Sequence, residues 1–112
     1  MTNLILTTDS YKHSHFLQYP PEARIISAYA EARPGGVAEE AVFLGLQPFL
    51  IDYLAKPVTT ADIDEAEALL AVHGEPFNRT GWEAIVADHG GFLPLEITAL
   101  PEGTVVPTSV PM

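Results

Sequence analysis

The chain has 112 residues, with fifteen acidic and five basic side chains and a formal net charge of −10. A field of this sign repels phosphate groups, so nucleic acids and anionic membrane surfaces are excluded as favoured partners. Cysteine is absent, which excludes disulfides and thiolate metal sites; the N-terminus also has no basic, apolar leader, and together these features predict a cytoplasmic protein. Because 47% of the residues are hydrophobic, we expect residues 1–112 to form a single domain around one core.

The first predicted elements flank a polar turn. Residues 4–7 are apolar and β-prone, which favours a short strand. Asp9 or Ser10 is suited to cap a helix over residues 11–17, and two prolines that follow must end it. The polar stretch therefore lies on a strand-to-helix turn.

Two more strands and a helix are predicted further along. Residues 24–33 alternate in polarity, as in a strand with one more apolar face, and the sequence Pro-Gly-Gly then breaks it. Residues 41–44 predict another strand. Residues 46–55 predict a helix that has Pro48 in its first turn and buries an apolar stripe.

The clearest helix is predicted over residues 61–73. Thr59 is placed to cap its N-terminus, and Gly74 is placed to end it. Apolar residues recur along it at spacings of three and four, which predicts a buried face. That face includes Ile63, Ala66, Leu70 and His73.

A second helix is predicted to begin at a capping box formed by Thr80 and Glu83, and to end at Gly90. We expect three of its apolar residues to face inward: Trp82, Ile85 and Val86. Residues 95–99 alternate like a strand, and a turn at 101–103 leads into another strand. The pattern predicts a small α+β fold with a mostly antiparallel sheet and several short helices.

Residue chemistry alone points to no catalytic site. His13 and His15 are two residues apart, so on a helix they point in different directions, and no further ligand completes a metal site. The acidic run at 62–67 matches no calcium loop and is typical of a helix N-terminus. No glycine-rich phosphate loop is present. The polar turn at residues 7–15 is the best candidate for a binding edge.

Several motifs taken together resemble the N-terminal region of nicotinamide phosphoribosyltransferases. They are TTDSYKHSHFLQYPP, SAYAEAR, EEAVFLGLQPFLIDYL and FNRTGWEAIVADHGGFLPLEITALPEGTVVP, and they cover nearly the whole chain. The resemblance implies an enzyme of NAD salvage that transfers phosphoribosyl from 5-phosphoribosyl 1-diphosphate to nicotinamide, giving nicotinamide mononucleotide and diphosphate. It also implies a homodimer with active sites at the subunit interface.

The resemblance carries roles onto three residues. Tyr11 matches the tyrosine that stacks on nicotinamide bound by the opposite subunit, and Asp9 lies beside the same pocket. An aromatic face suits a flat pyridine ring, and a carboxylate accepts from a carboxamide NH₂. Arg33 matches an arginine near the phosphate and diphosphate, a role that suits a guanidinium. The alternatives are a helix cap for Asp9 and a plain surface charge for Arg33.

The resemblance also implies an α/β barrel that follows this region in the family and is absent from these 112 residues. We therefore expect the chain to be inactive alone and to bind no cofactor by itself, while magnesium and ATP are implied for the complete enzyme. We also expect it to need a barrel domain or barrel chain as partner, or to self-associate through exposed apolar residues. The candidates for that exposure are Phe43, Leu44, Phe49, Trp82 and Phe92. The alternative is a non-catalytic binding module that keeps the fold.

Overall fold

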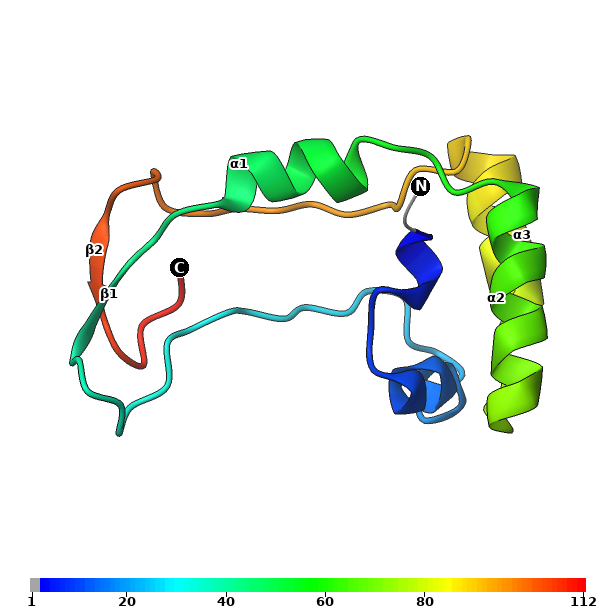
Figure 1. The fold of residues 1–112 in the computed structure, drawn as a ribbon, viewed down its shortest axis with the longest axis horizontal. Coiled ribbons are helices and arrows are strands. Elements are labelled where there is room, and N and C mark those ends of the chain that lie inside the picture. The colour runs from blue at the N-terminus through cyan, green and yellow to red at the C-terminus, as the bar shows by residue number, and fades with distance from the viewer. Residues whose placement is uncertain (1–2) are drawn as a thin grey trace.

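The computed structural model describes residues 3–112, and Figure 1 shows them as an open frame. Helices α2 (Thr60–His73) and α3 (Arg79–His89) form one end, and strands β1 (Glu40–Val42) and β2 (Val105–Pro107) form the other. The radius of gyration is 16.5 Å, whereas a compact domain of this length has about 13 Å. The architecture is α+β, as predicted, and the described residues contain no barrel.

Helix α2 confirms the predicted signals at both of its ends. The backbone N–H of Asp62 donates to Thr59 Oγ1 over 3.3 Å, and the Thr59 N–H donates to Asp62 Oδ2 over 2.8 Å. This reciprocal capping box satisfies amides that have no partner within the helix. Gly74 ends the helix in a left-handed conformation with φ of 74°, which glycine adopts without steric cost.

The main core lies where residues 4–6 pack against α2. Ile63, Ala66 and Leu70 are buried as predicted, whereas His73, the last residue of the predicted stripe, is exposed. A cluster of Ile5, Val58, Ile63 and Ala66 is covered by partly buried side chains, namely Leu4, Leu6, Phe77, Trp82 and Val86. The core therefore belongs to one end of the frame.

The predicted strand at residues 4–7 is wrong, because these residues form the 3-10 helix η1 (Leu4–Leu6). The buried Asn3 explains the turn: its Oδ1 accepts from the Ile5 N–H at 3.0 Å, and its Nδ2 donates to the Asp62 carbonyl at 2.8 Å. A side chain that bonds its own backbone two residues on competes with strand pairing. Asn3 thus bends the chain and anchors it to α2.

Helix α3 exists as predicted, but its predicted capping box is wrong. Asn78 is the N-cap and its Oδ1 accepts from the Gly81 N–H at 3.0 Å, while Glu83 accepts from Arg79 instead of returning to the cap. The helix ends at Gly90, as expected. Gly91 follows with φ of 85°, and a Cβ there would collide with the Val58 carbonyl, so glycine permits the close approach of this turn to the start of α2.

The predicted helix at residues 46–55 is confirmed as α1 (Leu46–Phe49), which has Pro48 in its first turn and continues as the π-helix η3 (Leu50–Leu54). Its apolar stripe is not buried as predicted. The Phe49 and Tyr53 rings stack 5.0 Å apart but both remain exposed. Leu50 and Leu54, the other two residues of the predicted stripe, are only half-buried.

The sheet is small and antiparallel, with Ala41 opposite Val106. The predicted strand at 41–44 is confirmed at Glu40–Val42, and the turn at 101–103 leads into β2 as expected. The predicted strands at 24–33 and 95–99 are extended, but within residues 3–112 they form no sheet apart from one bridge between Glu31 and Pro111. Both segments are exposed along nearly their whole length, so neither face of the predicted strands is buried.

Candidate functional site

The candidate binding edge lies on the 3-10 helix η2 (Ser10–Leu17), which confirms the predicted helix there. Asp9 occupies the N-cap position, but its carboxylate makes no capping hydrogen bond. It pairs instead with Lys12, whose Nζ lies 3.3 Å from Asp9 Oδ2. Capping is therefore not the role of this exposed carboxylate.

Tyr11 presents its ring to solvent, with 56% of the residue exposed. The ring lies 5.6 Å from that of His15 in a tilted arrangement, and Lys12 Nζ is 5.9 Å from the Tyr11 ring centroid. An exposed aromatic face next to a cation suits a flat, electron-poor or polar ring as ligand. Asp9 and Tyr11 thus lie together on one edge, and Lys12, the residue after Tyr11, lies near both side chains.

A hollow of about 270 Å³ lies between η2 and α3. It is lined by Lys12, His13, Phe16, Asn78, Gly81, Trp82 and Ile85. Burial lowers the pKa of His13, and the Glu75 carboxylate partly opposes that shift. His13 is therefore mainly a neutral imidazole at pH 7, able to donate or accept a hydrogen bond. Sequence reasoning missed this hollow because no local signal places Trp82 beside His13.

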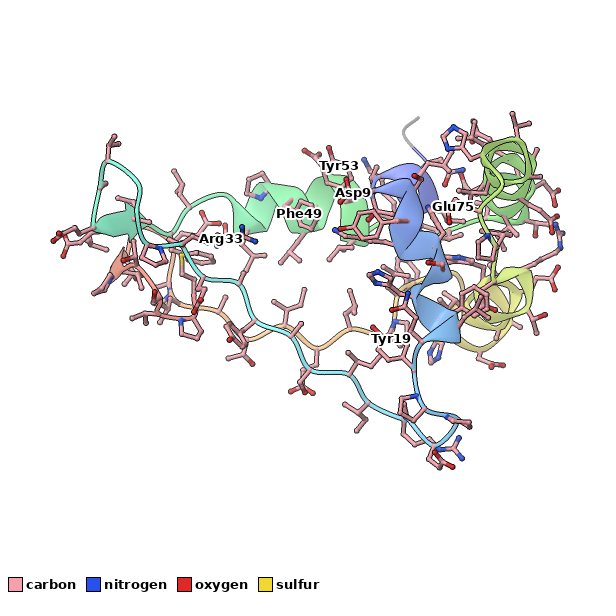
Figure 2. All side chains as sticks on the ribbon, turned by 90° about the horizontal axis from the view of Figure 1, so that it is seen from below. Asp9, Tyr19, Arg33, Phe49, Tyr53 and Glu75 are labelled. Carbon is pink, nitrogen blue, oxygen red and sulfur yellow. The ribbon has the colours of Figure 1, made fainter. Side chains whose placement is uncertain are left out.

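Arg33 lies apart from this edge. Figure 2 shows Arg33 on the side of the frame nearer the sheet, whereas Asp9 lies on the side nearer α2 and α3. Arg33 follows Ala32, whose carbonyl accepts from the Ser109 N–H at 2.8 Å, and it is exposed. The structure brings Asp9 and Tyr11 together and does not bring Arg33 to them within one chain.

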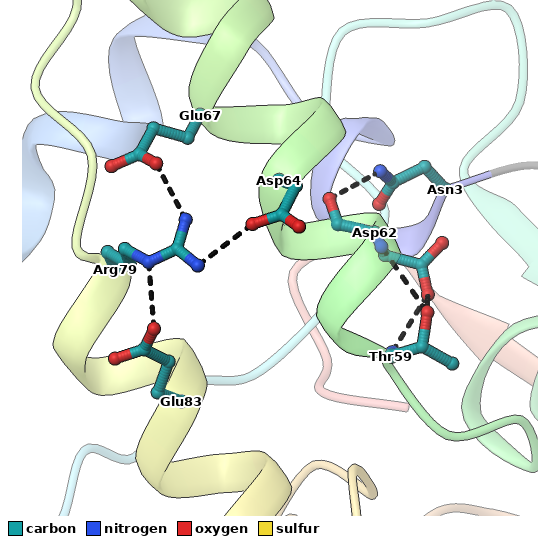
Figure 3. A network of polar contacts seen from close by, with 7 residues as sticks. All are labelled: Asn3, Thr59, Asp62, Asp64, Glu67, Arg79 and Glu83. Carbon is teal, nitrogen blue, oxygen red and sulfur yellow. Dashed lines mark hydrogen bonds and ion pairs between the residues drawn. The ribbon is translucent and has the colours of Figure 1, made fainter.

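Arg79 is a residue whose importance the sequence analysis missed. Figure 3 shows its guanidinium between three carboxylates, with nitrogen to oxygen distances of 2.8 Å to Asp64, 2.6 Å to Glu67 and 2.7 Å to Glu83. These hydrogen bonds raise the pKa of Arg79 well above its ordinary value. The available signal was an acidic run followed by a nearby arginine. Its role is to join α3 to α2.

Replacing Arg79 with methionine is expected to lower the melting temperature by several degrees, because three carboxylates then face one another without a cation. The loss should shrink at high salt, since screening weakens repulsion between exposed charges. Thermal unfolding followed by circular dichroism at low and high salt measures both effects. Arg24→Met is the matched control, because Arg24 has no ion pair within residues 3–112. Equal melting temperatures for the two variants would show that the three ion pairs of Arg79 do not stabilise the fold.

Residues 3–112 contain neither a metal-binding cluster nor a membrane-spanning helix. No three histidine, aspartate or glutamate side chains in this range are close enough together to hold a metal ion. No helix in the same range combines the length and hydropathy needed to cross a membrane.

Comparison with known proteins decides the family. A family profile described as "Nicotinamide phosphoribosyltransferase, N-terminal domain" matches residues 3–97. The chain belongs to this family. A nicotinamide phosphoribosyltransferase of Xanthomonas campestris pv. campestris (strain 8004) is 56% identical over 108 residues, which are 96% of this chain and 23% of that protein. A nicotinamide phosphoribosyltransferase of Acinetobacter baylyi is 30% identical over 125 residues, which are 98% of this chain and 25% of that protein.

The chain thus spans about a quarter of the length of these curated relatives. Membership of the N-terminal domain family agrees with the motif resemblance and with the absence of a barrel among the described residues.

Proposed function

We propose that this chain is the N-terminal domain of a nicotinamide phosphoribosyltransferase, an enzyme that forms nicotinamide mononucleotide and diphosphate from nicotinamide and 5-phosphoribosyl 1-diphosphate in NAD salvage. The observation that carries the proposal is 56% identity to a protein of that name over 96% of the chain. Residues 1–112 are proposed to form one domain of it, although residues 1–2 lie outside the described structure. Without the barrel that the family supplies, the chain is inactive.

Three residues are proposed to contribute to substrate binding in the complete enzyme. The exposed ring of Tyr11 stacks on nicotinamide across a homodimer interface, and the Asp9 carboxylate accepts from the carboxamide. Arg33 binds phosphate or diphosphate. The separation of Arg33 from the other two in one chain supports a pocket shared between subunits.

Magnesium and ATP belong to the proposed reaction of the complete enzyme rather than to this chain. Residues 3–112 offer no cluster of acidic or histidine ligands that fits a metal ion. No role proposed for Asp9, Tyr11 or Arg33 depends on either group.

A chimera tests the proposal. This chain replaces the matching 108-residue stretch of the Xanthomonas campestris protein, and formation of nicotinamide mononucleotide is measured. We expect kcat/KM within about an order of magnitude of the parent enzyme, because a domain of the same role restores the site. The chain alone is the control and should be inactive.

The alternative function, a non-catalytic module, predicts a different result. A folded chimera with no activity, beside an active parent enzyme, would favour a module that holds a partner through its apolar surface. The exposure of Leu44, Phe49 and Phe92, which confirms the expected apolar surface, is compatible with both functions.

A further inference from the structure

Two extended segments of the frame have backbones without partners. Within residues 3–112, residues 24–29 and 96–100 make no backbone hydrogen bond. Exposed backbone donors and acceptors along a straight segment are a template for strand pairing. Apolar side chains stand exposed on both segments, including Ile25 at 87%, Tyr29 and Ile97.

The space between the two segments is open. A hollow of about 690 Å³ is lined by Arg24 to Ala28 on one side and by Pro94 to Glu96 and Thr98 on the other. A second hollow of about 310 Å³ continues it past Tyr29 and Ile97 to Met112. In Figure 1 the two segments run along opposite sides of the frame, with the C-terminal residues between them. The space between residues 24–29 and 96–100, called the gap below, is thus bordered by two extended segments, and the C-terminal residues fill one end of it.

The C-terminal residues at this end show in which direction a strand in the gap would run. Residues 109–112 pair antiparallel with residues 30–32 through the bridge between Glu31 and Pro111 and the hydrogen bond from the Met112 N–H to the Ala30 carbonyl at 3.0 Å. The Ala32 carbonyl also accepts from this segment. Because successive residues of a strand direct their backbone groups to opposite sides, even-numbered residues face the gap. Ala28 is next in that series.

We propose that the gap receives a β-strand of the phosphoribosyltransferase polypeptide that lies beyond these residues, running antiparallel to residues 24–30 in the direction set by residues 109–112. Two observations favour this occupant. The strand position is continuous with a pairing already formed, and the matched stretch is only 23% of the Xanthomonas campestris relative. The proposal rests on the proposed function for the source of the strand.

The register follows from the existing bridge. Glu31 lies opposite Pro111, so each step away from this pair moves one residue back on the first segment and one residue forward on the second. Ser27 therefore lies opposite the third residue after Met112, in a non-hydrogen-bonded pair whose Cα atoms are about 4.5 Å apart. That separation is within the range that a disulfide bridges.

Disulfide trapping tests the register directly, because the chain has no cysteine of its own. The chain is extended after Met112 by eight residues of alternating valine and threonine, with cysteine as the third. We expect Ser27→Cys to cross-link to this cysteine within one chain at least several-fold faster than Ile26→Cys, which lies one residue out of register on the opposite face. Equal rates, or cross-links only between chains, would overturn the proposal.

Proline substitutions in the chain that carries the cysteine pair test whether the added strand is hydrogen-bonded to residues 24–30 or only lies close to them. Ala28→Pro removes an N–H that faces the gap and should abolish the cross-link, whereas Ile25→Pro removes one that faces away and should leave most of it. An identical loss in both variants would contradict the assigned direction.

The same cysteine pair is also placed in the chimera, which repeats the test in a chain of full length. Cross-linking does not require catalysis. An inactive chimera with the expected cross-link would overturn only the proposed function, and an active chimera without it would overturn only the strand.

Discussion

Ile63→Ala is expected to lower the free energy of unfolding by about 2–5 kcal/mol, the usual cost of deleting a buried aliphatic side chain and leaving a cavity. Ile63 is 0% exposed and belongs to the cluster with Ile5, Val58 and Ala66. Within residues 3–112 few other large side chains are fully buried, so few core contacts remain to compensate for those lost. Against the total stability of about 5–15 kcal/mol typical of proteins, the loss is large.

Urea unfolding of the chimera, followed by the fluorescence of Trp82, measures the effect of Ile63→Ala. Trp82 packs against the same core and reports its opening directly, provided that the tryptophans of the relative are replaced. The matched control is Val72→Ala on the same helix, where the side chain is 85% exposed and the cost should be below about 0.5 kcal/mol. Similar losses for both variants would mean that α2 does not bury Ile63 in solution.

Local signals were sufficient to predict α2. The Thr59 cap, the apolar spacing and Gly74 all act within a few residues of one another, and each is found where expected. The capping box of α3 failed because Asn78 and Thr80 both have capping side chains, and the interaction of Glu83 with Arg79 decided between them. That contact involves a network reaching α2, which no short window of sequence contains.

The predicted strands show a different limit of prediction from sequence. Alternation in residues 24–33 and 95–99 correctly predicts extended backbone, but pairing needs a second strand, and within residues 3–112 only the bridge between Glu31 and Pro111 provides one. The sequence therefore predicts the conformation and not the sheet. The exposure of Phe49 and Tyr53 has the same origin, since an apolar stripe predicts burial only where another element covers it.

One part of the candidate site could be predicted from the sequence and another part could not. Asp9 and Tyr11 are two residues apart, so the sequence already places them on one turn, and the structure leaves both exposed. The hollow beside them joins His13 to Trp82, which are far apart in the sequence. Their proximity depends on how η2 packs against α3 and was not predictable from motifs.

Tyr11→Ala in the chimera is expected to raise the KM for nicotinamide about tenfold, with a smaller change in the KM for 5-phosphoribosyl 1-diphosphate. Aromatic stacking contributes about 0.5–1.5 kcal/mol beyond surface burial, and about 1.4 kcal/mol is tenfold in affinity. Tyr11 is exposed and its side chain belongs to no core cluster, so the fold should survive the change. Steady-state kinetics with each substrate varied in turn measures the two constants.

Two further variants identify the interaction that Tyr11 makes. Tyr11→Phe keeps the aromatic face and should retain nearly the parent KM, because stacking does not use the hydroxyl. Tyr19→Ala removes another exposed tyrosine just past the end of η2 and should change neither constant. If Tyr11→Ala also left the KM for nicotinamide unchanged, Tyr11 would not contact the substrate. If Tyr11→Phe were as impaired as Tyr11→Ala, a hydrogen bond from the hydroxyl would replace stacking as the basis of recognition.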